Sequence, residues 1–99
     1  MHKLLVLYPE PTDPAEFEAY YRETHLPLCA QLPGVLGISF SIGIANAPYF
    51  AVFEARFTDE AALGAALSSP EGRAVEADVP NYATGGAEVF TFEVEDVPL

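Results

Sequence analysis

The sequence is poor in basic side chains. Its 99 residues include 4 Lys and Arg residues against 15 Asp and Glu residues, which gives a formal net charge of -11 at pH 7. A surface this acidic repels phosphate backbones and anionic lipid headgroups. Nucleic acid and membranes are therefore unfavourable partners.

Cysteine and long hydrophobic runs are also scarce. The only cysteine, Cys29, cannot form an internal disulfide, and as a lone helical cysteine it is expected to be a small buried side chain. The apolar run at residues 4–7 is far shorter than the ~18 residues of a membrane span, and no secretory segment is expected. These features predict a reduced, cytoplasmic protein.

Several motifs with well-known chemistry are missing. The sequence has no Gly-rich phosphate loop and no nucleophilic serine elbow, and His2 has no partner at metal-ligand spacing. Nucleotide binding, covalent serine chemistry and a metal site are thereby disfavoured, and we expect no cofactor.

The composition that remains is typical of one folded domain. Hydrophobic residues make up 51% of the chain, and no linker or internal repeat divides it. Because domains cluster near 100–150 residues, we expect residues 1–99 to form a single domain.

Hydrophobic patterning predicts strands at residues 2–8, 35–44, 49–57 and 87–95. Helices are expected to begin after Asp13, Asp59 and Ser69. The first helix should bury a stripe made of Phe17, Tyr20, Tyr21, Thr24 and Leu28. Pro27 should break this helix near His25, because proline lacks the N–H that would bond the carbonyl of Glu23. The order is β-α-β-β-α-β, which predicts an α+β ferredoxin-like sandwich with a four-stranded antiparallel sheet.

Apolar residues occupy both faces of the strands predicted at 2–8, 49–57 and 87–95. Helices on one side of the sheet would leave the other side exposed, and an exposed apolar face of that size is an association site. The sequence therefore predicts a homodimer whose two open sheet faces turn toward each other.

His25 is the strongest candidate for chemistry, because it lies beside the helix break and imidazole titrates near neutral pH. Tyr21 lies one turn earlier, so both side chains could act on a carbonyl or hydroxyl ligand. Asp78, in the predicted loop before the last strand, could orient His25. The alternatives are structural: His25 could cap carbonyls freed by Pro27, and Asp78 could serve as a turn residue before Pro80.

Five further residues are predicted to contact the ligand. Asn81 and Tyr82 lie in the segment that feeds the last strand, where polar groups are commonly placed for binding. Tyr20 belongs to the aromatic stripe, and the alternative for it, as for Tyr21, is a core aromatic. Ser39 and Ser41 lie on the nearly bare face of the second strand and would leave room for a ligand if that face lines the cavity.

One pattern in the first half of the chain carries a family resemblance. It reads Asp13-Pro14-x-x-Phe17-x-x-Tyr20-Tyr21-x-x-x-His25-x-Pro27-Leu28, followed by Pro33-Gly34. Supporting segments are Pro48-Tyr49, Ser69-Pro70-Glu71-Gly72 and Ala77-Asp78-Val79-Pro80-Asn81-Tyr82. Together they resemble the EthD family over almost the whole chain. This resemblance implies a dimeric α+β barrel, places the family's histidine at His25 and its aspartate at Asp78, and implies an oxidoreductase label.

Three functions stay open at this point. The first is a cofactor-independent oxidoreductase or isomerase of catabolism, in which a small apolar metabolite with a carbonyl or enol exchanges a proton with His25. The second is a non-catalytic binding or accessory protein for an oxygenase system. The third is haem binding through His25.

Overall fold

The computed structural model describes residues 1–99 and contains the predicted order of strands and helices. Its elements are β1 (His2–Tyr8), α1 (Pro14–Tyr20), the π-helix η1 (Tyr21–His25), α2 (Leu26–Cys29), β2 (Gly37–Ile42), β3 (Ala51–Phe57), α3 (Glu60–Ser68), α4 (Pro70–Asp78), the 3-10 turn η2 (Val79–Asn81) and β4 (Glu88–Glu93). The ferredoxin-like α+β fold is thus confirmed.

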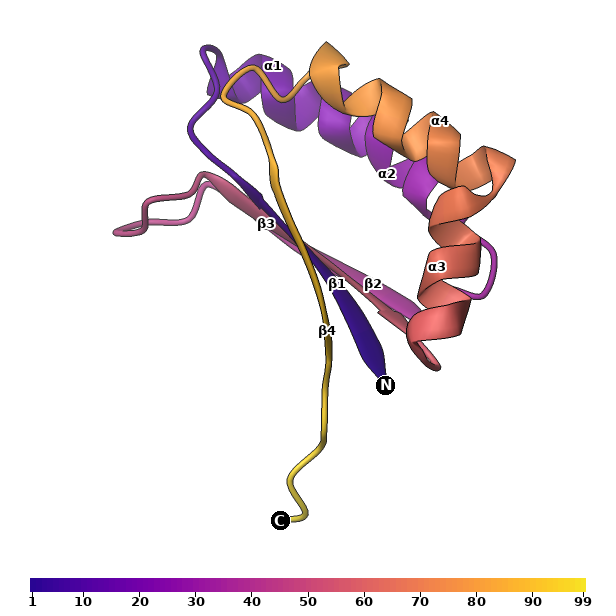
Figure 1. Cartoon of the computed structure of the whole chain (residues 1–99). Helices are drawn as coiled ribbons and strands as arrows, with labels where there is room; N and C mark the ends of the chain where they lie inside the picture. The colour runs from indigo at the N-terminus through magenta and orange to yellow at the C-terminus, as the bar shows by residue number, and fades with distance from the viewer.

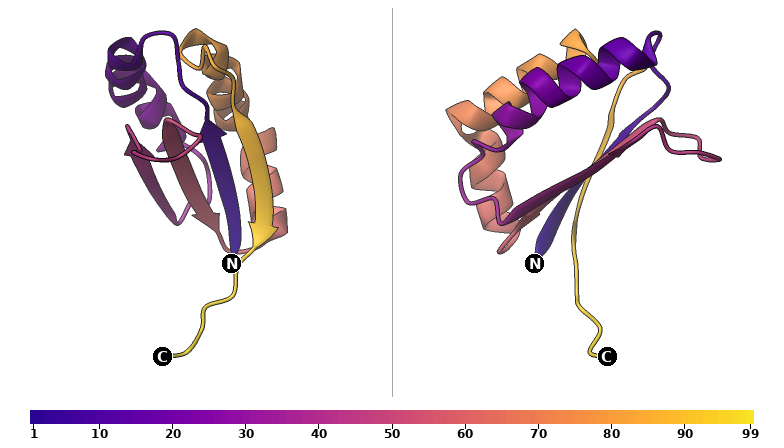
Figure 2. Two further views of the ribbon diagram at one scale, coloured as in Figure 1. Left: turned by 90° about the vertical axis from the view of Figure 1, so that its left-hand side faces the viewer. Right: turned by 180° about the vertical axis from the view of Figure 1, so that it is seen from behind.

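The four strands form one antiparallel sheet in the order β2-β3-β1-β4. All helices lie on one side of this sheet, and the last residues of the chain extend beyond its edge (Figures 1 and 2). β1 is an inner strand, and β2 pairs with β3. Three of the predicted strands, β2, β3 and β4, are shorter than expected, and β3 begins at Ala51 rather than at residue 49. β2 stops at Ile42, because Gly43 turns the chain with φ 72°. β4 stops at Glu93, which pairs with His2 at the start of β1, and one more bond follows from the N–H of Val94 to the carbonyl of Met1.

The core lies between the helices and the covered face of β1 and β3. On this face Val6 pairs with Phe53, and Tyr8 pairs with Ala51. These side chains are almost completely buried, as is Phe17 of α1. No helix of the chain is both long enough and apolar enough to cross a membrane.

The first helix changes its winding next to Pro27, as predicted. The N–H of Leu26 donates to the carbonyl of Tyr21, one residue further back than in an α-helix, which makes η1 a π-helical turn. The predicted buried stripe is wrong in part, because Thr24 is exposed. Four aromatic or small side chains at a spacing of four are buried instead: Phe17, Tyr21, His25 and Cys29. In a regular α-helix, residues four apart are rotated by about 40° beyond a full turn, so a row at this spacing gradually leaves the buried face. The wider π turn offsets that rotation and keeps all four side chains on the buried face.

The helix-free face of the sheet is mixed in character. Leu5 and Phe90 lie side by side on it, and Lys3 pairs with Glu54 at 3.4 Å. Phe90 and Phe92 are 48% and 40% exposed in the single chain. This face is therefore the one that the sequence predicts to be covered by a second copy.

Helices α3 and α4 meet at a tight corner. A Cβ atom on Gly72 would lie 2.2 Å from the carbonyl oxygen of Ala66, a distance that no side chain tolerates. Glycine at this position lets the first turn of α4 approach the end of α3. The corner in turn fixes where the later part of α4, including Asp78, lies over the sheet.

Candidate functional site

An apolar cavity of about 470 Å³ lies between the helices and the sheet. Its walls come from β1, β3, β4 and the helical layer, and 11 of its 15 lining residues are hydrophobic. The polar groups on its wall are few, and they include His25 and Glu76. His25 is 2% exposed, whereas Glu76 is exposed at the surface. His25 is therefore the one buried imidazole on the wall of an otherwise apolar cavity.

His25 is bonded to Asp78. Its Nδ1 atom lies 2.9 Å from Oδ2 of Asp78, and both residues are buried. The sequence predicted this pairing but placed Asp78 in a loop, which is wrong: Asp78 is the last residue of α4. The helix capped by Ser69 extends to this residue, so a rigid element carries the carboxylate.

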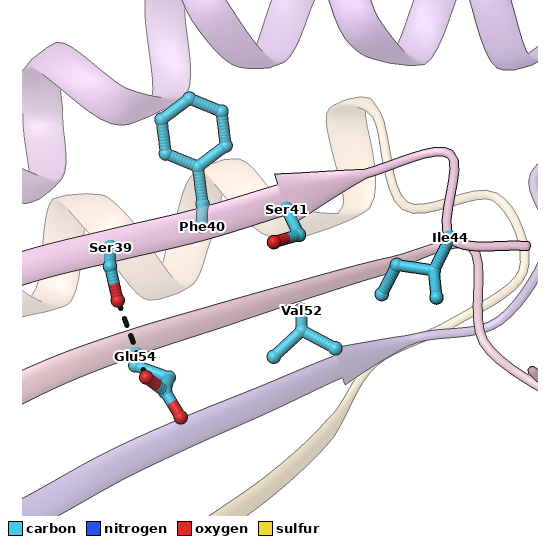
Figure 3. A pocket seen from close by; sticks show the side chains of 6 residues that line it. All are labelled: Ser39, Phe40, Ser41, Ile44, Val52 and Glu54. Atoms are coloured by element: carbon cyan, nitrogen blue, oxygen red, sulfur yellow. Dashed lines mark hydrogen bonds between the residues drawn. The ribbon is translucent and has the colours of Figure 1, made fainter.

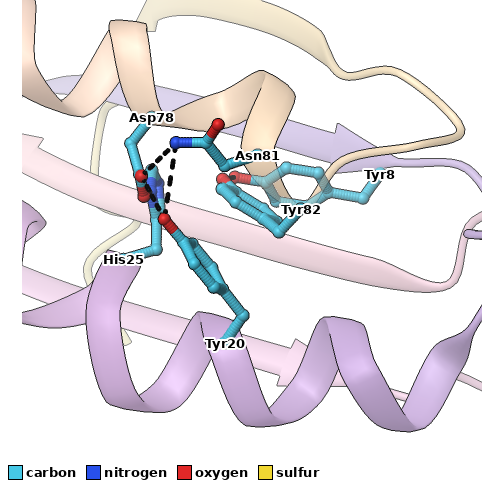
Figure 4. Close-up of polar contacts among 6 residues, drawn as sticks. All are labelled: Tyr8, Tyr20, His25, Asp78, Asn81 and Tyr82. Carbon is cyan, nitrogen blue, oxygen red and sulfur yellow. Dashed lines mark hydrogen bonds and ion pairs between the residues drawn. The ribbon is translucent and has the colours of Figure 1, made fainter.

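Two more residues bind the same carboxylate (Figure 4). The hydroxyl of Tyr20 donates to Oδ1 of Asp78 at 2.5 Å, and Nδ2 of Asn81 donates to the same oxygen at 3.0 Å. Nδ2 of Asn81 also lies 3.4 Å from the Tyr20 hydroxyl. Both residues were predicted as ligand contacts, and in the structure both bond Asp78.

These contacts decide the charges of the pair. Burial alone would raise the pKa of Asp78, but the hydrogen bonds from Tyr20, Asn81 and His25 together outweigh it and hold that pKa below its usual 3.8. Burial lowers the pKa of His25 below 6.5, against the opposing effect of Asp78. At neutral pH the pair is thus a carboxylate and a neutral imidazole.

The tautomer of His25 follows from these charges. An ionised carboxylate only accepts hydrogen bonds, so Nδ1 carries the proton and Nε2 carries a lone pair. Nε2 makes no hydrogen bond within the chain. It is also not enclosed, because the only fully buried side-chain nitrogen or oxygen without a partner is Oη of Tyr21. Such a nitrogen can accept a proton from a molecule in the cavity.

A cluster of aromatic rings supports the imidazole. The ring of Tyr21 stacks on His25 with centroids 5.4 Å apart, and the ring of Tyr82 lies 4.5 Å away. The hydroxyls of Tyr82 and Tyr8 share a hydrogen bond of 2.7 Å. Burial raises the pKa of Tyr21 far above its usual value, so its phenol stays protonated. Neither Tyr21 nor Tyr82 lines the cavity, and the structure gives both a packing contact with His25.

The structure separates Ser39 and Ser41 from this site. Both serines point away from the helices, and the hydroxyl of Ser39 donates to Glu54 at 3.3 Å (Figure 3). They line a separate hollow of about 370 Å³ that opens mainly on the helix-free face. The bulky side chains of the same strand face the helices, so the bare side of β2 cannot border the cavity beside His25.

Of the predicted site residues only His25 lines the cavity, and sequence reasoning missed the rest of its wall. Tyr8 of β1 and Val89 of β4 both line it. Alternation placed them on particular strand faces, but only the strand order shows that these faces meet around His25. Cys29 also lines the cavity, and burial raises its pKa to about 12, so its thiol stays protonated. No cluster of three metal-ligating side chains occurs in the structure.

A buried neutral imidazole should make the fold sensitive to mild acid. Above pH 6.5 His25 is neutral in both states; below it the unfolded chain binds a proton that the folded chain resists. The free energy of unfolding should fall as pH decreases from 6.5 to the lower folded pKa, by at most about 1.4 kcal/mol per pH unit. Asp78 adds a loss in the same direction below its unfolded pKa of 3.8. Urea unfolding of wild type and His25→Gln between pH 7.5 and 5 checks this. Equal losses in both proteins would contradict it.

Comparison with known proteins identifies the family. The model of the EthD domain matches residues 9–86. An uncharacterized 11.0 kDa protein of Rhodococcus erythropolis, from the thcB-thcC intergenic region, is 34% identical over 101 residues, with 98% of each chain covered. The crystal structure of an ethyl tert-butyl ether degradation (EthD) family protein from Bacillus halodurans has a TM-score of 0.90 at 25% identity, covering 96% of this chain and 99% of that one.

More distant structures share the fold. SnoaB, a cofactor-independent oxygenase from Streptomyces nogalater, has a TM-score of 0.73 at 20% identity over 97% of this chain and 94% of its own. A dimeric ferredoxin-like protein of unknown function from Thermobifida fusca has a TM-score of 0.74 at 18% identity over 94% and 90%. The family model and the relative from Rhodococcus erythropolis span most of the sequence, and this chain belongs to the EthD family.

Proposed function

We propose that the protein binds a small, neutral, largely apolar molecule beside His25 and that His25 acts on it as a general base. The observation that carries this proposal is the Asp78–His25 pair on the wall of an apolar cavity. Buried aspartate–histidine pairs fix the imidazole for proton transfer, as in hydrolase triads. Here the pair has no neighbouring nucleophilic hydroxyl, so proton transfer itself is the chemistry that it supports.

The charges around the cavity favour a neutral ligand. None of the four basic residues, Lys3, Arg22, Arg56 and Arg73, lines it. Glu76 at its wall and the net charge of -11 repel anions. A carboxylate or phosphate would lose its hydration without gaining a cation, so its binding should be weak.

The reaction that fits these groups begins on a carbon next to a carbonyl, or on an enol. Nε2 of His25 takes the proton, the C–H or O–H bond electrons move into the ligand to form an enolate, and Asp78 stabilises the imidazolium that results. Return of the proton to a different atom makes the protein an isomerase. Oxidation of the enolate by dioxygen would make it a cofactor-independent oxidoreductase, and SnoaB, which shares this fold, is an oxygenase of that kind.

We further propose that the working unit is a homodimer. The helix-free face carries Leu5, Leu7, Val52, Phe90 and Phe92, and the structural relative from Thermobifida fusca is described as dimeric. A second copy on this face would remove the exposed phenylalanines from water. Removing apolar surface from water would stabilise the dimer by about 25 cal/mol for each Å² buried.

Occupation of the cavity can be tested with the neutral fluorescent probe N-phenyl-1-naphthylamine. We expect saturable binding by wild type and at least about 10-fold weaker binding by Val89→Trp, because the larger ring fills the cavity wall. Val89 is 59% exposed, so the folded chain can accommodate the indole. Val97→Trp is the matched control, since Val97 is 77% exposed in the C-terminal tail and should leave binding unchanged. Equal binding by all three proteins would contradict the proposed cavity site.

The accessory alternative differs in one measurable respect. It predicts saturable probe binding but no protein-catalysed proton exchange on a neutral ketone, an outcome that would overturn the general-base role. Haem binding through His25 is the less favoured alternative, because haem carries two carboxylates and no Lys or Arg residue lines the cavity; a Soret band on titration with haem would support it.

A further inference from the structure

We infer that Tyr20 and Asn81 are positioning residues that lock the Asp78 carboxylate onto His25. This inference rests on the proposed function, because it assigns how the general base is held. It replaces the ligand contacts that the sequence predicts for both residues.

The three hydrogen bonds of Asp78 divide between its two oxygens. Oδ2 faces Nδ1 of His25, while Oδ1 receives both Tyr20 and Asn81 (Figure 4). Rotation of the carboxylate would break all three bonds at once. A carboxylate held on one oxygen alone could swing away from the imidazole.

The four residues of this hydrogen-bonded cluster come from separate parts of the chain. Tyr20 ends α1 and His25 ends η1, whereas Asp78 ends α4 and Asn81 ends η2. The cluster therefore ties the N-terminal helical segment to the C-terminal one at the point where both pass over the sheet. Stacking of Tyr20 on Tyr82, with centroids 5.8 Å apart, fixes the direction of the phenol.

Tyr20 and Asn81 do not face the cavity beside His25. They line a different hollow, of about 210 Å³, together with polar residues of the loop before α1. The hydroxyl proton of Tyr20 is already committed to Asp78. Tyr20 and Asn81 can therefore affect a ligand in the apolar cavity only indirectly, by holding Asp78 against His25.

The chemical effect of the two donors is on the tautomer. Two neutral donors on Oδ1 favour the ionised form of Asp78, which can only accept the proton on Nδ1. Without them Asp78 can rotate, and the imidazole can place its proton on Nε2 instead. A base with its lone pair on the wrong nitrogen cannot accept a proton from the cavity.

The test uses ¹⁵N NMR of histidine-labelled protein near neutral pH, with Tyr20→Phe and Asn81→Ala. We expect one tautomer of His25 in wild type, with Nδ1 protonated, and a mixture of tautomers in each variant. Tyr49→Phe is the matched control: it removes a phenol hydroxyl from the loop before β3, outside the site, so it should keep the wild-type tautomer. Asn81 is exposed, which makes Asn81→Ala informative even if Tyr20→Phe folds poorly.

The second readout is proton exchange of 2-tetralone, a neutral bicyclic ketone, in D₂O. We expect kcat to fall about 10- to 100-fold in both variants, the usual effect of losing a hydrogen bond to a charged group, with KM unchanged. A raised KM with unchanged kcat would overturn the inference and make both residues ligand contacts.

The two proposals fail in different ways. An altered tautomer without any exchange by wild type supports positioning and contradicts the general base. Exchange that depends on His25, with an unaltered tautomer in both variants, supports the general base and overturns positioning.

Discussion

Replacing His25 with glutamine should lower protein-catalysed exchange of the α-protons of 2-tetralone by about 10²- to 10⁴-fold, the usual contribution of a positioned general base. Glutamine can still donate a hydrogen bond to Asp78 from about the same place, so the buried carboxylate keeps a partner. What it lacks is a basic nitrogen toward the cavity. The measurement is the loss of the ketone's α-proton signals in D₂O by ¹H NMR.

Two comparisons make this result specific. His2→Gln is the same substitution at the start of β1, outside the site, and should exchange at the wild-type rate. Binding of N-phenyl-1-naphthylamine to His25→Gln should stay within about twofold of wild type, because the cavity keeps its shape. Undiminished exchange by His25→Gln would exclude the imidazole as the base.

Replacing Phe90 with glutamate should convert the proposed homodimer to a monomer. Phe90 lies on the helix-free face beside Leu5, where a second copy would enclose it. An unpaired carboxylate buried there costs about 3 kcal/mol or more per side chain, which weakens association by at least about 10²-fold. Sedimentation velocity at micromolar concentration measures the change.

Val89→Glu is the matched control for assembly. Val89 is the preceding residue of β4 and faces the helices, so its charge should leave the dimer intact even where it disturbs the cavity. A wild-type protein that sediments as a monomer would contradict the dimer directly. Equal dissociation of both variants would instead contradict the helix-free face as the interface, because the two charges lie on opposite faces of β4.

Much of the fold could be predicted because its signals are local. Alternating residues place Leu4, Val6 and Tyr8 on one side of β1, and Asp13, Asp59 and Ser69 accept the hydrogen bonds that begin their helices. Pro27 revealed the break in the first helix because a missing N–H is visible in the sequence. These features need only neighbouring residues.

The site was only partly predictable, because it depends on contacts between distant residues. His25 and Asp78 are 53 positions apart, and the sequence offered their pairing only as one alternative, beside a turn role for Asp78. The roles of Tyr20 and Asn81 depend on which oxygen of Asp78 they reach. The position of Ser39 depends on which side of β2 the helices cover. Alternation defines two sides of a strand but does not say which one is packed.

The π-helical turn of η1 makes the site sensitive to insertions and deletions as well as to substitutions. Each residue of a regular helix rotates the next side chain by about 100°, so removing one position between Tyr21 and His25 would swing the imidazole away from α4. A variant with that deletion could keep every functional residue and still lose the contact between Asp78 and His25. The length of this short segment is therefore as important to the contact as the identity of the residues within it.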